Sequence, residues 1–143
     1  MKLSKRTEYA IRAMVHLGKL EPGQFMQARD IASAENLPAK FLESVMLTLK
    51  KVGVAQSKVG SGGGYRLSKR PSDLLIGRII RQLEGESPSP ARPEGPIGQH
   101  ALGMIQELVA NAHAKTLDTL SLEQLLDDVL KTMGQSRQDM YFI

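Results

Sequence analysis

The chain has 143 residues, no cysteine and a formal net charge of +4 at pH 7. It is long enough to bury the core of one ordinary domain, and without cysteine it has no disulfide, no thiolate metal site and no cysteine nucleophile. No apolar run approaches the length of a bilayer span, and the amino terminus lacks a signal-peptide pattern, so we expect a cytoplasmic protein that does not bind membranes.

Basic residues are concentrated in the first half of the chain. Residues 1–70 contain thirteen Lys and Arg against five Asp and Glu, a net charge of +8. Residues 71–143 contain six against ten, a net charge of −4. Lysine and arginine neutralise phosphate groups and release their counterions, so this division indicates that the first half binds a polyanion such as DNA.

Two helices are expected at the start of the chain. The first runs to about Leu20 and has an apolar stripe at helical spacing, formed by Ala10, Ala13, Met14 and Leu17. A shorter helix is expected over residues 27–35. It is followed by Asn36, and asparagine is one of the few residues besides glycine that tolerates the left-handed conformation of a sharp turn.

A third helix is expected from Pro38, whose missing N–H suits a first helical turn. One of its faces is apolar and carries Leu42, Val45, Leu49 and Val52. The other face carries side chains of the kind that meet phosphates and base edges in a major groove, namely Lys40, Glu43, Ser44, Thr48 and Lys51. The second and third helices, joined by a sharp turn, describe a helix-turn-helix.

A β-hairpin with a glycine-rich tip is expected next, because residues 54–59 and 65–67 flank the turn Gly60-Ser61-Gly62-Gly63-Gly64. Two interpretations of these glycines stay open: they form only a tight turn, or they let the backbone approach a phosphate chain beside Lys58 and Arg66. A nucleotide-binding loop is a poorer fit, since no Gly-Lys-Ser/Thr sequence opens a helix here. With the hairpin, residues 1–75 form a winged helix-turn-helix that binds DNA.

The second half, residues 76–143, is expected to hold a linker helix over 76–84, a proline-rich loop over 85–98, a helix from Ala101 to about Leu117, and a last helix. The last helix opens on a capping box at Ser121 and runs to about Lys131. The tail from Gly134 to Ile143 has no convincing period, and we expect it to be loose or docked on a partner.

The long helix of this half carries a narrow, mostly apolar seam, formed by Leu102, Ile105, Val109, Ala112 and Thr116. The seam either packs on the chain's own core or pairs with a second copy. We favour a homodimer, because a two-fold reader of DNA needs a self-complementary interface. The predicted fold class is mainly α with a small β-hairpin, a winged helix-turn-helix plus a long dimerisation helix.

Several spaced segments of the chain together resemble the Rrf-two family of bacterial transcription regulators. They are Met1-Lys2-Leu3-Ser4, Thr7-Glu8-Tyr9-Ala10, Asp30-Ile31-Ala32, Phe41-Leu42-Glu43 and Gly60-Ser61-Gly62-Gly63-Gly64-Tyr65-Arg66-Leu67. The resemblance is close over about residues 1–85 and looser beyond them. It implies a homodimeric winged helix that binds an imperfect palindrome in promoters, with the dimer formed through the long helix.

The resemblance also implies roles for individual residues. Lys40, Glu43 and Ser44 would face bases, and Lys5 and Tyr9 would touch the DNA backbone. The wing would enter the minor groove, with the contact residues Lys58, Gly60, Gly62, Gly63, Gly64 and Tyr65.

The chain departs from the family pattern at the wing. Family wings usually carry Arg immediately before the glycines, where this chain has Val59, with Lys58 one place earlier. Adjacent side chains of a strand point to opposite faces, so Lys58 does not simply replace that Arg. Minor-groove reading by this wing is therefore left open.

A second departure lies in the proline-rich loop, where many family members place three cysteines that hold an iron–sulfur cluster. Because this chain has no cysteine, a cysteine-ligated cluster is excluded and no cofactor is predicted. His100 resembles the histidine that follows those cysteines, and Glu94 is a carboxylate close to it. The two form either a weak site for another metal ion or effector, or an ordinary surface, and we favour the ordinary surface.

The sequence thus predicts a transcriptional regulator, in most cases a repressor, that binds palindromic double-stranded DNA as a homodimer. One alternative is a protein-interaction module that uses the winged helix as a scaffold for an acidic partner. An enzyme is least expected, since no Ser-His-Asp arrangement, phosphate loop or carboxylate cluster is present. The effector stays open among a small molecule, a metal ion, a partner protein and none.

Overall fold

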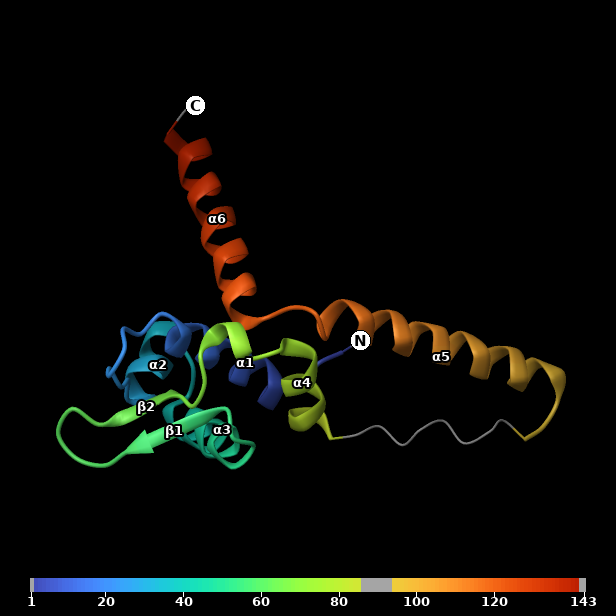
Figure 1. Cartoon of the computed structure of the whole chain (residues 1–143), viewed down its shortest axis with the longest axis horizontal. Helices are drawn as coiled ribbons and strands as arrows, with labels where there is room; N and C mark the ends of the chain where they lie inside the picture. Colours follow the sequence, from blue (N-terminus) through green and yellow to red (C-terminus); the bar gives the residue numbers. More distant parts are fainter. Residues whose placement is uncertain (1, 86–93, 142–143) are drawn as a thin grey trace.

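The computed structural model describes residues 2–85 and 94–141, with side chains as far as residue 134. The described part is mainly helical and carries a two-stranded antiparallel hairpin, as predicted (Figure 1). In chain order its elements are α1 (Lys5–Gly18), α2 (Ala28–Glu35), α3 (Ala39–Lys51), β1 (Ala55–Lys58), β2 (Gly64–Leu67), the 3-10 turn η1 (Pro71–Asp73), α4 (Ile76–Glu84), α5 (Ile97–Leu117) and α6 (Leu122–Tyr141).

Local signals in the sequence account for the start of α1 and for the turn between α2 and α3. The Ser4 hydroxyl accepts a hydrogen bond from the backbone N–H of Thr7 at 3.2 Å, so serine caps α1 in the usual manner. Asn36 ends α2 in the left-handed conformation, with φ 54°. This confirms the sharp turn of the helix-turn-helix and orients α3 across α2.

The core is formed mainly where α1 and α3 face each other. α1 contributes the predicted stripe of Ala10, Ala13, Met14 and Leu17, all buried. α3 buries Leu42, Val45, Met46 and Leu49. Val52, which the sequence placed on this apolar face, is only half-buried at the end of the helix, and Met46 joins the core in addition.

The hairpin is joined to the body by backbone hydrogen bonds. Its strands pair in the register Ala55 with Leu67 and Lys58 with Gly64. Tyr65 also exchanges two backbone hydrogen bonds with Met26, of 2.8 and 2.9 Å, so the segment before α2 adds a third extended partner. The wing is therefore fixed to the start of the helix-turn-helix.

The hydrophobic core contains residues from both sides of residue 75, where the sequence predicted the boundary between the DNA-binding region and the second half. α4 buries Ile76, Ile79, Ile80 and Leu83, and α6 buries Leu122 and Leu126 in the same cluster. Leu75 and Ser121 form an antiparallel bridge that holds the start of α6 against the start of α4. Beyond these contacts α5 and α6 project from the body in different directions (Figure 1).

Two predicted boundaries in the second half are wrong. α5 begins at Ile97 and not at Ala101, because Pro96 is compatible with a helix start and the residues after it continue the helix. α6 continues to Tyr141, so the tail from Gly134 is helical as far as that residue. The segment from Gly134 to Tyr141 has no apolar period to indicate a helix. It also has no proline to end one, and its single glycine is tolerated at a cost of about 1 kcal/mol.

Part of the predicted proline-rich loop, residues 86–93, lies outside the described residues. Within the part that the structure describes, no helix combines the length and the apolar character needed to cross a membrane.

Candidate nucleic-acid interface

The outer face of α3 is the most prominent polar surface of the helix-turn-helix. Lys40, Glu43 and Ser44 are exposed in its first two turns, on the side opposite the buried leucines. Lys51 is exposed at its end, and Thr48 is half-buried with its hydroxyl donating to the backbone carbonyl of Ser44 at 3.2 Å. The structure thus brings together the three residues that the sequence predicted to face bases, and their contact with DNA stays a prediction.

A groove of about 490 Å³ separates α3 from the wing. It is lined by Gln27, Ala28, Arg29, Glu43, Leu47, Lys58, Gly60, Gly63, Gly64 and Tyr65. Glu43 therefore shares a concave surface with the predicted wing contacts. Arg29 was not predicted at this site. The sequence placed it on the outer side of the second helix, and nothing in the sequence indicated that this helix begins beside the hairpin.

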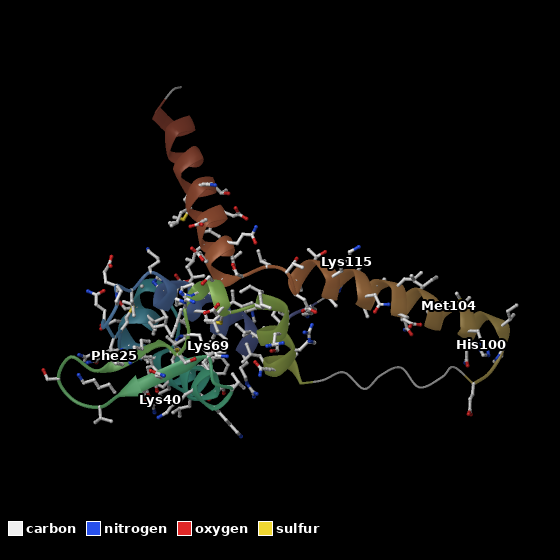
Figure 2. The ribbon with its side chains drawn as sticks, in the orientation of Figure 1. Phe25, Lys40, Lys69, His100, Met104 and Lys115 are labelled. Carbon is white, nitrogen blue, oxygen red and sulfur yellow. The ribbon has the colours of Figure 1, made fainter. Side chains whose placement is uncertain are left out.

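The cations of the wing lie on an aromatic ring that the sequence did not single out. The guanidinium carbon of Arg66 is 4.7 Å from the centroid of the Phe25 ring, and the Lys58 Nζ is 5.7 Å from it. Figure 2 shows Phe25 beside the hairpin. Cation–π attraction of this kind contributes about 0.5–1 kcal/mol at exposed sites, so Phe25 restrains both cations along the hairpin.

The tip of the wing carries no cation. Val59 stands there, and its side chain is 96 % exposed. In the β ladder Lys58 faces Gly64, and the nearest wing cations are held back on Phe25. The structure therefore provides no long cationic side chain at the position where the Rrf-two pattern has arginine.

The four predicted wing glycines have different surroundings. Gly60 and Gly62 have positive φ, 97° and 73°, and open space where a Cβ would stand. A Cβ on Gly63 would collide with the backbone carbonyl of Lys58, and one on Gly64 would lie 2.5 Å from the carbonyl oxygen of Met26. Close backbone packing thus requires glycine at positions 63 and 64, whereas the outer two glycines serve the turn.

The predicted backbone contacts on α1 lie at its start. Lys5 is exposed and forms an ion pair of 3.3 Å with Glu8. The Tyr9 ring meets the Phe41 ring edge-to-face, with centroids 5.1 Å apart, and the Arg12 guanidinium lies 5.8 Å from the Tyr9 centroid. Tyr9 therefore holds α1 against the first turn of α3, and contact of Lys5 and Tyr9 with DNA stays a prediction.

A second contact fixes α1 to the end of α2. Glu35 accepts hydrogen bonds from Arg12 Nε at 2.9 Å and pairs with His16 Nε2 at 2.7 Å. The His16 hydrogen bond and then that of Arg12 lower the pKa of Glu35 below its ordinary value, against a smaller opposing effect of burial. This contact thus joins the middle of α1 to the end of α2.

The predicted dimerisation seam is uncovered in the single chain. No residue of α5 is buried, and Leu102, Ile105 and Val109 are each about half exposed. The chain's own core therefore does not cover the seam. At the carboxyl end of α5, the Arg81 guanidinium of α4 pairs with Asp118 at 2.6 Å.

The two residues considered for an effector or a metal ion are Glu94 and His100. Glu94 and His100 are both exposed, and Figure 2 shows His100 at the far end of α5. In residues 2–85 and 94–134, no three His, Asp or Glu side chains gather into a group that could hold a metal ion. Among the described residues, no hydrogen bond joins Glu94 to His100, and their role stays a prediction.

A family profile covers most of this chain. The Rrf2 profile, described as an iron-dependent transcriptional regulator, matches residues 3–130. A cysteine-ligated iron–sulfur cluster does not fit the donor set of this chain, because thiolates supply its usual ligands and the sequence has none.

Individual relatives agree with the profile. The chain is 36 % identical over 84 residues to the transcriptional regulator NsrR of Geobacillus kaustophilus, a match that spans 59 % of this chain and 57 % of that protein. The solved structure of T. potens IscR is similar, with a TM-score of 0.76 and 28 % identity over 90 % of this chain and 88 % of the other. CymR of B. subtilis, titled a global cysteine regulator, has a TM-score of 0.72 and 30 % identity over 89 % and 97 %. The chain belongs to the Rrf2 (Rrf-two) family of DNA-binding, winged helix-turn-helix transcription regulators.

Proposed function

We propose that this protein binds palindromic promoter DNA as a homodimer and represses transcription by occluding the promoter. The observation that carries the proposal is the exposed face of α3, where Lys40, Glu43 and Ser44 stand beside a groove that the wing completes. A helix of this kind inserts into the major groove, with its first turns against the base edges. The place of action is the cytoplasm, and no catalytic role is assigned.

The homodimer is proposed because α5 has an exposed apolar stripe. A helix with Leu102, Ile105 and Val109 uncovered on one side exposes an apolar stripe that water disfavours. Pairing of two such helices about a two-fold axis would cover the stripe and would place two copies of α3 on one face of a duplex. The half-sites would then lie one or two helical turns apart, about 34–36 Å for one turn.

Regulation would act through the spacing of the two α3 helices. α5 is anchored to α4 at Asp118, and α4 is buried in the core beneath the helix-turn-helix. An effector that changes how the α5 helices pair would therefore move one DNA-reading unit relative to the other. We propose that the signal is not a cysteine-ligated cluster; the candidates are a small molecule, a metal ion, a partner protein or no effector at all.

The test is a selection of random duplexes on the purified protein at near-physiological salt, followed by sequencing of the bound pool. The expected result is an inverted repeat, bound with an affinity that falls steeply with salt concentration. A matched variant, Lys40→Ala with Glu43→Ala, should still bind DNA but should lose the ranking of sequences. An unenriched pool from the unaltered protein would contradict the proposal.

A further inference from the structure

The outer face of α3, which we propose contacts DNA, contains one large apolar side chain that does not pack in the core. Leu47 is 59 % exposed although it lies in the middle of α3. The other exposed apolar residue of this helix, Phe41, packs against Tyr9 and so has a partner within the chain. Leu47 is not among the described hydrophobic residues that form the core or pack against it, and it lines the groove toward the wing.

The position of Leu47 follows from helix geometry. An α-helix turns about 100° per residue, so Leu47 lies one turn beyond Glu43 and on the same face as Ser44. The buried side of α3 is formed by residues three and four apart that point the other way, including Met46 and Leu49. Leu47 is therefore near the centre of the surface that the proposed function presents to DNA.

The charges around Leu47 fit a nucleic acid better than an apolar protein surface. Lys40 and Lys51 are exposed on the same face, two turns before and one turn after it, and Arg29 lines the same groove. Cations at the edge suit phosphate groups, whereas the apolar centre needs an apolar partner. In the major groove, the C5-methyl group of thymine is the apolar feature of the base edges.

We propose that Leu47 packs on the C5-methyl group of a thymine and so makes thymine the preferred base at one position of each half-site. The inference rests on the proposed function and adds a base preference to it. Glu43 is suited to accept a hydrogen bond from the N4 amino group of cytosine. Four residues of helix advance about 6 Å, so the thymine should lie within about two base pairs of the base that Glu43 contacts.

The test replaces each thymine of the selected site, one at a time, by deoxyuridine, which lacks only the methyl group. The unaltered protein should lose affinity about fourfold at one position per half-site, the value of one buried methyl group. Leu47→Ala should bind the thymine site more weakly and should show no further loss on deoxyuridine substitution at that position. Leu47→Met, which keeps an apolar side chain of similar reach, should restore the sensitivity.

The matched control is Val59→Ala, which removes an apolar side chain that is more exposed than Leu47 from the wing tip and should leave the deoxyuridine effect unchanged. The inference is overturned if the unaltered protein is indifferent to every thymine-to-deoxyuridine change, or if Leu47→Ala keeps the full effect. Unchanged DNA affinity of Leu47→Ala would also overturn it and would point to a protein partner on this face. If a palindrome is selected, the proposed function stands even when one of these results overturns the role of Leu47. If no sequence is selected, the proposed function and the role of Leu47 both fail.

Discussion

The carboxylate of Glu84, the last residue of α4, accepts a hydrogen bond of 2.8 Å from the backbone N–H of Ser4, the cap of α1. This bond from Ser4, followed by the side chain of Thr7, lowers the pKa of Glu84 below its ordinary value. It joins the end of α4 to the start of α1, where Lys5 and Arg6 are exposed. The start of α1 is thereby held in place by a residue far along the chain.

The first prediction concerns the pH dependence of this contact. Because the pKa of Glu84 is lower in the folded chain than its ordinary value of 4.5, its stabilisation is present above that value and is lost as pH falls through the folded pKa. Glu84→Ala should therefore be less stable than the unaltered protein at pH 7, and the difference should shrink below about pH 4.5. Urea unfolding at several pH values measures it.

The control for this prediction is Glu21→Ala, which removes an exposed carboxylate from the loop after α1. Its unfolding free energy should follow that of the unaltered protein at all pH values. If the difference in unfolding free energy between Glu84→Ala and the unaltered protein stays constant down to pH 3, the charge of the Glu84 carboxylate is not the source of the stabilisation.

The second prediction concerns the aromatic support of the wing. Phe25→Leu keeps an apolar side chain but removes the ring on which Lys58 and Arg66 lie. The loss of about 0.5–1 kcal/mol per cation–π contact should weaken DNA binding several-fold, because the two cations are no longer restrained. Affinity for a selected duplex measures the effect. Phe25→Tyr keeps the ring and should bind as the unaltered protein does, and equal binding by the leucine variant would rule out this role.

The third prediction compares two glycines of the wing tip. Gly62→Ala places a methyl group in open space and costs only the strain of a left-handed residue, about 1–2 kcal/mol. Gly64→Ala adds a collision with the Met26 carbonyl oxygen, 2.5 Å from the new Cβ, and should destabilise more. Thermal or urea unfolding of the two variants gives the comparison. Equal loss of stability would mean that the backbone of the wing yields easily at Met26.

The fourth prediction concerns the proposed dimer. Ile105→Asp places a charge in the middle of the α5 seam, where its side chain is now 57 % exposed. A charge cannot be buried there without a partner, so the variant should sediment as a monomer while its helix content is unchanged. Glu107→Lys changes charge on the same helix, at an exposed position on the side opposite Ile105 and Val109, and should remain dimeric. Two sedimentation profiles that coincide would argue against pairing through α5.

Much of the fold could be predicted from local pattern. The apolar stripes of α1 and α3 repeat with the helical period because one side of each helix is buried, and Asn36 marks a turn that few residues can adopt. The glycine-rich turn likewise marked the hairpin. The end of α6 was missed, because its sequence shows no apolar period.

The sequence by itself determined the winged helix-turn-helix and the polar face of α3, since these depend on residues a few positions apart. Only the tertiary structure decided which distant residues meet at the site. Phe25 lies under the wing cations, Arg29 enters the groove beside Glu43, and Glu84 reaches Ser4 from the end of α4. Contacts between segments far apart in the chain depend on which faces pack together, and an apolar period shows that a helix has a buried face but not which segment covers it.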